Sequence, residues 1–240
     1  MVTQHQHPLE PRYRAVWETT LQDRQLSAEH VAASRFFFDF QNKQPVPKRF
    51  DTYAILCGLP FSQSAQNVLE RCWQRCLSVL QHPLAYGVSP ANRHTEIFLF
   101  QRPEEMFSRA EVQTGIQASL PIAGEVHRFK IVLRHPFLTP DGTIVAPGFD
   151  EPAGTIDALR ARLQQAVTAC PKKQSQWLHV SLGRILEPIA EKRLRPLLDR
   201  MQSLWGEFID EAVVDEFLWI WEKQWYMADR EVLDRRRLGR

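Results

Sequence analysis

The sequence predicts a mixed fold of helices and strands built from two similar halves. Apolar residues alternate with a period of two in several short runs, as in strands. Between these runs they repeat at every third and fourth position, as in amphipathic helices. Each half has the order strand, helix, histidine-bearing strand, and weak internal duplication is the simplest account of that order. With 240 residues, the chain can form one large domain or two small lobes.

Residues 1–48 are expected to form an N-terminal helical extension. Apolar residues recur near helical spacing from about residue 11 to residue 40, and Ser27 can begin a second helix in this stretch. Residues 42–48 contain two prolines with polar neighbours, so the helix should end there.

The main domain is expected to span residues 49–229, with lobes of roughly 49–125 and 126–229. In the first lobe, the apolar patterns predict a strand at 53–59, a helix capped by Ser62 or Ser64 that runs to Leu80, a strand at 93–100, and a short helix with a loop within 103–120.

The second lobe repeats this order of patterns. They predict a strand at 129–133, a hairpin turn at Pro140-Asp141-Gly142, a helix at about 155–170, a strand at 177–186, a helix at about 190–209, and a last strand from 216 to 221 that runs on toward 226. The basic residues 230–240 are expected to form an exposed tail.

Composition restricts the class of protein. An apolar fraction of 44% and a charged fraction of 24% are typical of a folded globular chain. A net charge of +2 argues against a protein that coats duplex DNA, so a nucleic-acid ligand should be a short end or a small nucleotide. No stretch approaches the ~18 apolar residues of a membrane span, and no hydrophobic secretion segment begins the chain. These observations predict a cytoplasmic protein that does not bind membranes.

Neither a metal nor a cofactor is expected. The four cysteines, at positions 57, 72, 76 and 170, lack zinc-site spacing and are interpreted as buried thiols. None of the ten glycines falls in a Walker or dinucleotide-binding pattern, and there is no Gly-x-Ser-x-Gly nucleophile elbow.

The tetrapeptide His179-Val180-Ser181-Leu182 carries the first functional signal. In a strand, His179 and Ser181 share one face while the apolar residues point into a core. An imidazole can move a proton near neutral pH, and a hydroxyl can donate a hydrogen bond to a phosphate oxygen. The alternative interpretation is a structural histidine on the wet face of a half-buried strand.

The corresponding strand of the first half contains His94, 85 positions earlier. By the same alternation, His94 and Glu96 share a face. If the two strands lie side by side, the imidazoles of His94 and His179 point into one cleft. The other candidates, His82, His127 and His135, have no hydroxyl two residues further on.

This pair of motifs resembles the 2H phosphoesterase superfamily, which is named for two His-x-Ser/Thr motifs. The resemblance covers about residues 50–230. The second motif matches fully, whereas His94-Thr95-Glu96-Ile97 matches only at the histidine and the final apolar residue, with Glu96 in place of the hydroxyl. Residues 215–221 are similar to the last strand of these proteins.

The resemblance implies a bilobal α+β fold, in which two pseudo-symmetric lobes of antiparallel sheet with flanking helices surround a central cleft. It also implies metal-independent hydrolysis of a phosphodiester, often a 2′,3′-cyclic phosphate of a nucleotide or an RNA end. His94 and His179 would then be the acid/base pair, and Ser181 would bind the phosphate.

Glu96 is the main objection to this function. A carboxylate about 4 Å from a phosphate charge would cost roughly 4 kcal/mol at an effective dielectric constant near 20. The site could survive if Glu96 bonds to His94 and raises its pKa, so that Thr95 or Arg93 binds the phosphate instead. Alternatively, the chain is a non-catalytic module of this fold that binds a nucleotide or a protein.

Further residues could bind the substrate. Arg93 and Arg184 adjoin the two histidines and could steer an anion, or could simply be solvated. Trp219 and Trp221, with Trp225 beyond them, could form a base-stacking platform or a packed core. A third interpretation is a scaffold that binds a protein partner through the helical region 11–40 and its Phe36-Phe37-Phe38 run.

Overall fold

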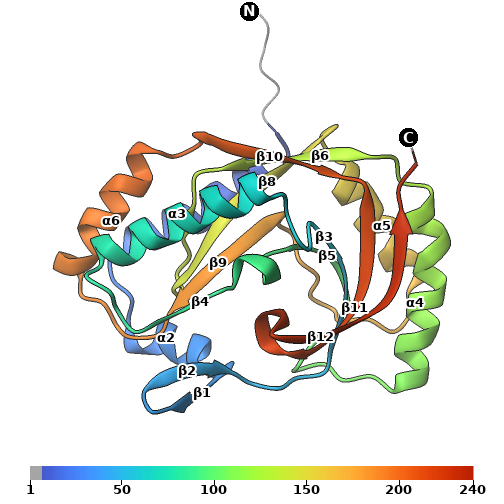
Figure 1. Cartoon of the computed structure of the whole chain (residues 1–240), viewed down its shortest axis with the longest axis horizontal. Helices are drawn as coiled ribbons and strands as arrows, with labels where there is room; N and C mark the ends of the chain where they lie inside the picture. Colours follow the sequence, from blue (N-terminus) through green and yellow to red (C-terminus); the bar gives the residue numbers. More distant parts are fainter. Residues whose placement is uncertain (1–6, 240) are drawn as a thin grey trace, which may run out of the picture.

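The computed structural model describes residues 7–239, in which two antiparallel sheets face each other (Figure 1). One sheet has the strand order β12-β11-β3-β5. It consists of β3 (Thr52–Cys57), β5 (Thr95–Gln101), β11 (Glu216–Gln224) and β12 (Asp229–Arg237). The other has the order β10-β6-β8-β9-β4, and β7 pairs with β8 beside this path. It consists of β4 (Ala85–Gly87), β6 (Phe129–Arg134), β7 (Phe137–Leu138), β8 (Thr143–Glu151), β9 (His179–Ile185) and β10 (Phe208–Val214).

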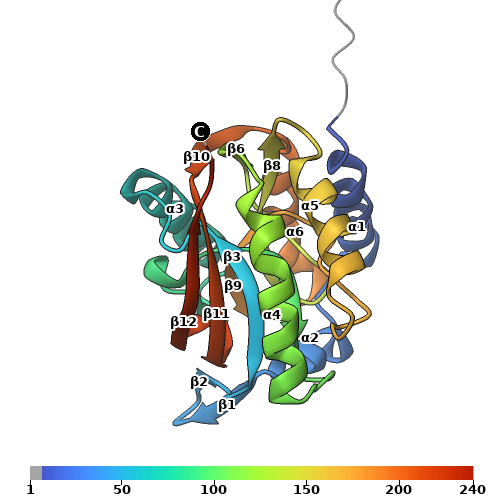
Figure 2. The same ribbon diagram turned by 90° about the vertical axis from the view of Figure 1, so that its right-hand side faces the viewer.

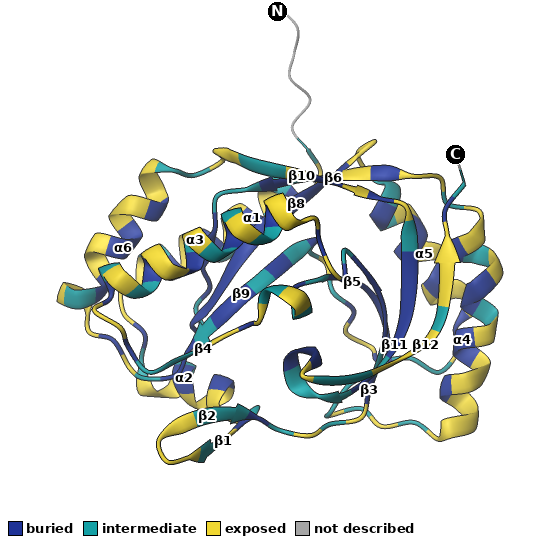
Figure 3. Cartoon of the chain, in the orientation of Figure 1, coloured by how far each residue is buried: buried dark blue, intermediate teal, exposed yellow. Residues whose placement is uncertain are grey.

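Helices flank both sheets, which confirms the predicted α+β class. The α-helices are α1 (Glu10–Asp23), α2 (Ala28–Arg35), α3 (Gln63–Val79), α4 (Arg109–Gly124), α5 (Thr155–Ala166) and α6 (Glu191–Ser203). Helix α4 runs along the outer side of the four-stranded sheet, beside α5 (Figure 2). Helix α3 packs against β9 and β10 of the other sheet. The inner faces of the helices and both sheets are buried, and exposed residues lie on the outside (Figure 3). No helix within residues 7–239 is long and apolar enough to cross a membrane.

The two sheets do not follow the predicted lobe boundaries. Strand β4 comes from the first half of the chain but pairs with β9 of the second half, and β11 and β12 return to pair beside β3. Sequence order could not show this exchange, because a strand pattern does not specify its neighbour. The consequence is that each wall of the central cleft is built from both halves of the chain.

The N-terminal residues differ partly from the predicted helical extension. Ser27 caps α2 as expected, since its hydroxyl accepts a hydrogen bond from the His30 amide. Residues 36–41 are not helical, however: β1 (Phe38–Gln41) and β2 (Gln44–Pro47) form a hairpin. Its turn residues, Asn42 and Lys43, both have positive φ, as a tight hairpin turn requires. Residues 1–6 lie outside the described part.

The expected exposed tail is instead an edge strand. Residues Asp229–Arg237 form β12, which pairs with β11, while Arg240 lies outside the described residues. Charged side chains are typical of exposed strand edges, so the basic composition fits an edge as well as a tail. The predicted helix at 190–209 ends at Ser203, and β10 begins at Phe208. Residues 109–124 form a full helix with a Ser108 capping box rather than a short helix.

Candidate active site

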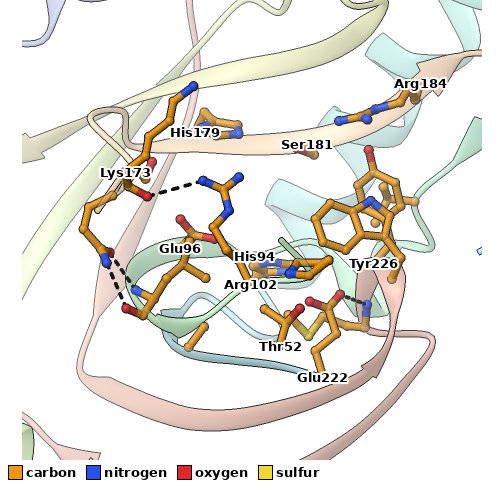
Figure 4. Close-up of a pocket in the computed structure, with 18 residues that line it drawn as sticks. Thr52, His94, Glu96, Arg102, Lys173, His179, Ser181, Arg184, Glu222 and Tyr226 are labelled. Carbon is orange, nitrogen blue, oxygen red and sulfur yellow. Dashed lines mark hydrogen bonds between the residues drawn. The ribbon is translucent and has the colours of Figure 1, made fainter. Parts of the chain in front are cut away.

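A cavity of about 280 Å³ lies between the two sheets and contains both predicted histidines (Figure 4). Its lining includes His94, Glu96, His179, Ser181 and Arg184, which the sequence had placed in two separate strands. Strands β5 and β9 contact each other at this point without pairing as a ladder. The structure therefore brings together most of the predicted site residues.

Strand alternation positions the two motifs. In β9, Val180 and Leu182 are buried in the core, while His179 and Ser181 are half-buried and line the cavity. In the first motif, His94 immediately precedes β5, Thr95 is buried, and Glu96 faces the cavity. The predicted faces are thus the observed ones.

His94 is held in one tautomer. Its Nδ1 lies 2.7 Å from the carbonyl oxygen of Asn92. A carbonyl can only accept, so Nδ1 must carry the proton and Nε2 keeps its lone pair. Burial lowers the pKa of His94 to about 4, and the nearby Arg230 charge acts in the same direction. Arg230, expected in the tail, donates to the Asn92 side chain at 2.6 Å.

His179 is also neutral at pH 7 in the ligand-free site. Burial lowers its pKa to about 4, and the charge of Arg160, or a proton on His94, acts in the same direction. Its ring packs edge-to-face against Trp177 at 5.5 Å, and its Nδ1 has no hydrogen-bond partner among the described residues. One imidazole must acquire a proton before it can act as an acid, and an anion bound nearby would raise its pKa.

Arg184 supplies a fixed positive charge beside Ser181, and Arg102 and Lys173 also line the cavity. The Arg184 side chain is 11% exposed and lies 3.5 Å from the Asp141 carboxylate. The guanidinium also lies 5.8 Å from the centre of the Tyr226 ring. Because arginine stays protonated at any relevant pH, Arg184 and the Ser181 hydroxyl can together bind phosphate oxygens.

Glu96 is accompanied by a second carboxyl that sequence reasoning missed. Glu222 of β11 lines the same cavity and is 5% exposed. Burial raises the pKa of Glu222 to about 8, with the Glu96 charge as a further cause. Burial also raises the pKa of Glu96, while Arg160 and Arg102 oppose that rise. The expected repulsion of phosphate assumed a fully charged Glu96, and burial acts against that charged form.

The prediction that Glu96 bonds to His94 while Thr95 or Arg93 binds the phosphate is wrong. Glu96 makes no hydrogen bond to His94, whose Nδ1 is taken by Asn92. Arg93 has no exposed surface and pairs with Glu70 on α3, and Thr95 is 1% exposed; neither lines the cavity. The cause is the alternation of side chains, which turns both neighbours of His94 and Glu96 away from the cleft.

The predicted base-stacking platform is also wrong for Trp219 and Trp221. Trp219 is fully buried and donates from Nε1 to the Ser119 hydroxyl on α4 at 2.8 Å. Trp221 stacks on Tyr53 at 5.7 Å. Both point to the α4 side of the sheet, whereas Glu222, one position further on, points into the cavity. The packed-core interpretation therefore holds for Trp219, whereas Trp221 is partly exposed and lies outside the cavity.

A tight turn after β11 brings aromatic rings to the cavity instead. Trp225 and Tyr226 line it, and Tyr226 has a φ of 60°. Left-handed backbone at a non-glycine residue is costly and persists only where surrounding contacts fix it. Here the ring of Phe37 stacks on Trp225 at 4.4 Å, and Tyr86 stacks on Tyr226 at 5.4 Å. In the sequence, the only indication of these aromatic lining residues was the position of Trp225 just after the last predicted strand.

Most of the Phe36-Phe37-Phe38 run, which was expected to bind a protein partner, packs against residues of this chain. Phe38 is 2% exposed, Phe37 packs on Trp225, and Phe36 is 52% exposed. Two of the three rings thus support the aromatic turn beside the cavity. A protein partner for the N-terminal region stays a prediction.

Glu222→Gln should make stability less sensitive to alkaline pH. With a pKa of about 8 in the folded protein against 4.5 ordinarily, Glu222 keeps a proton that the unfolded chain has lost in this interval. Wild-type stability must therefore fall as pH rises from about 4.5 to 8. Relative to wild type, the free energy of unfolding of the variant should rise by on the order of 4 kcal/mol between pH 5 and 8.5.

Urea unfolding at several pH values measures this gain, with Glu211→Gln on the exposed edge of β10 as the matched control. The glutamine keeps the Oε1 that accepts from the Met227 amide at 3.0 Å. A stability difference between variant and wild type that does not change with pH would contradict the prediction.

Two antiparallel sheets that enclose one histidine from each half of the chain define the class: this is the LigT-like 2H phosphoesterase fold. TT0787 of Thermus thermophilus is similar over 78% of this chain and 98% of its own, with a TM-score of 0.51 and 16% identity. E. coli LigT complexed with 3′-AMP is similar over 79% of this chain and 99% of its own, with a TM-score of 0.50 and 13% identity. No protein-family model matches this sequence, and no curated protein has a significant match to it.

Proposed function

We propose that this protein is a phosphodiesterase that hydrolyses a 2′,3′-cyclic phosphate of a nucleotide or an RNA end without a metal ion. The observation that carries the proposal is the meeting of His94 and His179 in one cavity with Ser181 and Arg184. Two bases, a hydroxyl and a fixed positive charge are the groups that such a reaction requires. The 3′-AMP in E. coli LigT supports a nucleotide as the class of ligand.

The chemistry follows from the two imidazoles. One neutral imidazole takes a proton from water as the water oxygen attacks phosphorus. The bond from phosphorus to a ribose oxygen breaks, and the other imidazole, in its protonated form, gives its proton to that oxygen. Ser181 and Arg184 stabilise the charge on the remaining phosphate oxygens. The fixed tautomer of His94 leaves Nε2 as its reacting atom.

Hydrolysis of 2′,3′-cyclic nucleotides and of a cyclic-phosphate RNA end, in the presence of EDTA, tests the proposal. Wild type is compared with the His94→Ala/His179→Ala double variant and with His82→Ala, whose histidine is exposed in a loop outside the cavity. Turnover that survives EDTA and His82→Ala, and is lost in the double variant, is the expected result. Turnover that requires a divalent metal would overturn the metal-independent mechanism.

The second candidate is a non-catalytic module that binds a nucleotide or a protein. Glu96 in the place of the family hydroxyl is the observation that favours it. If folded wild type hydrolyses no cyclic phosphate but binds nucleotides, this candidate replaces the first. A cytoplasmic location also stays a prediction.

A further inference from the structure

The two ends of the cavity differ in chemistry. One end contains Ser181 and Arg184 beside His179, so it offers hydrogen-bond donors and a fixed positive charge. The other end contains Glu96 and Glu222, whose carboxyl oxygens are acceptors, beside His94 (Figure 4). A phosphodiester bound by two equivalent motifs would be held by donors at both ends. The hydroxyl and guanidinium donors of the Ser181 end suit phosphate oxygens better than the two carboxyls of the other end, where Arg102 also lines the cavity.

A threonine completes the acidic end. Thr52 of β3 lies directly opposite Glu222 of β11 in the antiparallel ladder, and both line the cavity. Thr52 is 4% exposed, yet its hydroxyl has no hydrogen-bond partner among the described residues. Leaving a buried hydroxyl without a hydrogen-bond partner costs free energy, so a ligand atom that bonds to the Thr52 hydroxyl would be favoured here.

We propose that Glu96, Glu222 and Thr52 form a subsite for a hydrogen-bond-donating group of the substrate nucleoside, which places its phosphate against Ser181 and Arg184. This inference rests on the proposed function and names the part of the substrate that the first motif binds. A nucleoside offers such donors in two places, the N–H groups of its base and its free 5′-hydroxyl. An ionised carboxylate repels phosphate oxygens, whereas a nucleoside N–H or O–H can donate to a carboxyl oxygen whether or not that carboxyl is protonated.

The surroundings favour a neutral donor over a cation. The buried Arg160 and the cavity-lining Arg102 both lower the pKa of Glu96 by their positive charge. Glu222 already accepts a hydrogen bond from the Met227 amide. A metal ion is a poor alternative ligand, because no group of three or more His, Cys, Asp or Glu side chains within residues 7–239 is arranged to hold one.

Steady-state kinetics on matched substrates test the subsite. The substrates are guanosine 2′,3′-cyclic phosphate, its purine riboside analogue, which lacks both the N1–H and the 2-amino group, and its 5′-O-methyl derivative, which lacks the 5′-hydroxyl donor. We expect wild type to prefer the parent compound by about tenfold or more in kcat/KM over one analogue, because a buried acceptor is left without its donor. The analogue with the reduced kcat/KM shows which group of the nucleoside is the donor.

The variants Glu96→Gln and Glu222→Gln should lose that preference, whereas Glu211→Gln on the exposed β10 edge should keep it. Glu96→Thr, which restores the family hydroxyl, should also lose it. The proposal is overturned if wild type treats all three substrates alike, or if each variant changes kcat/KM by one factor on all of them.

Failure of the proposed function is a separate outcome, recognised when wild type hydrolyses none of the compounds. In that case calorimetry with guanosine 3′-monophosphate, its purine riboside analogue and its 5′-O-methyl derivative repeats the comparison. A tenfold or greater difference in affinity that Glu96→Gln and Glu222→Gln remove supports the subsite. Equal affinities, or no binding, overturn it.

Discussion

Replacing His179 with alanine is expected to lower kcat for a 2′,3′-cyclic nucleotide by about 10²–10⁴-fold, because one of the two proton transfers loses its side chain. His94→Ala should have an effect of similar size. The double variant should be only slightly slower than either single variant, since groups that act on one transition state are not additive. Stopped assays over hours measure the residual rates, with His82→Ala as the control.

The pH profile separates a proton-transfer role from a structural one. With both pKa values at about 4 in the free protein, the population with one protonated and one neutral imidazole is greatest near pH 4. The kcat/KM value should therefore fall about tenfold per pH unit above pH 5. The profile of kcat should extend to higher pH, because the bound phosphate raises an imidazole pKa. Single variants that keep the wild-type profile at reduced amplitude would contradict acid/base roles.

Arg160→Met is expected to destabilise the fold by about 3 kcal/mol or more and to lower kcat about tenfold to a hundredfold. Arg160 of α5 is 5% exposed and donates to three backbone carbonyls: those of Glu96 and Ile97 in β5, each at 2.9 Å, and that of Trp177 just before β9, at 2.6 Å. One guanidinium therefore links the two strands that carry the histidine motifs. Without it, three backbone carbonyls lose a charged donor and the motifs are free to shift.

The matched control is Arg162→Met on the same helix. Arg162 is exposed and pairs with Glu125 at the surface, so its loss should change stability by less than about 1 kcal/mol. Arg160→Lys keeps the charge but cannot supply the planar set of donors, and it should recover only part of the loss. Urea unfolding and kcat measured on the same preparations provide the test. An Arg160→Met protein as stable and as active as Arg162→Met would show that the link is dispensable.

Local patterns predicted much of the fold and the two histidine motifs of the cavity. The alternation in residues 177–186 placed His179 and Ser181 on the wet face and Val180 in the core, as observed. Helix α3 begins after the predicted Ser62 cap. The order of elements also led from His179 to His94. Such features depend on near neighbours in the chain, so a single sequence contains the information for them.

Backbone geometry repeats over a few residues, so local patterns were enough to predict the fold class, the two histidine-bearing strands and which of their side chains share a face. Which strands and side chains meet depends on the tertiary packing. This packing paired β12 with β11, buried Arg93 against Glu70, turned Trp219 to α4, and brought Glu222 and Thr52 to Glu96. Contacts of this kind depend on strand order and packing between distant segments, and a local pattern specifies neither.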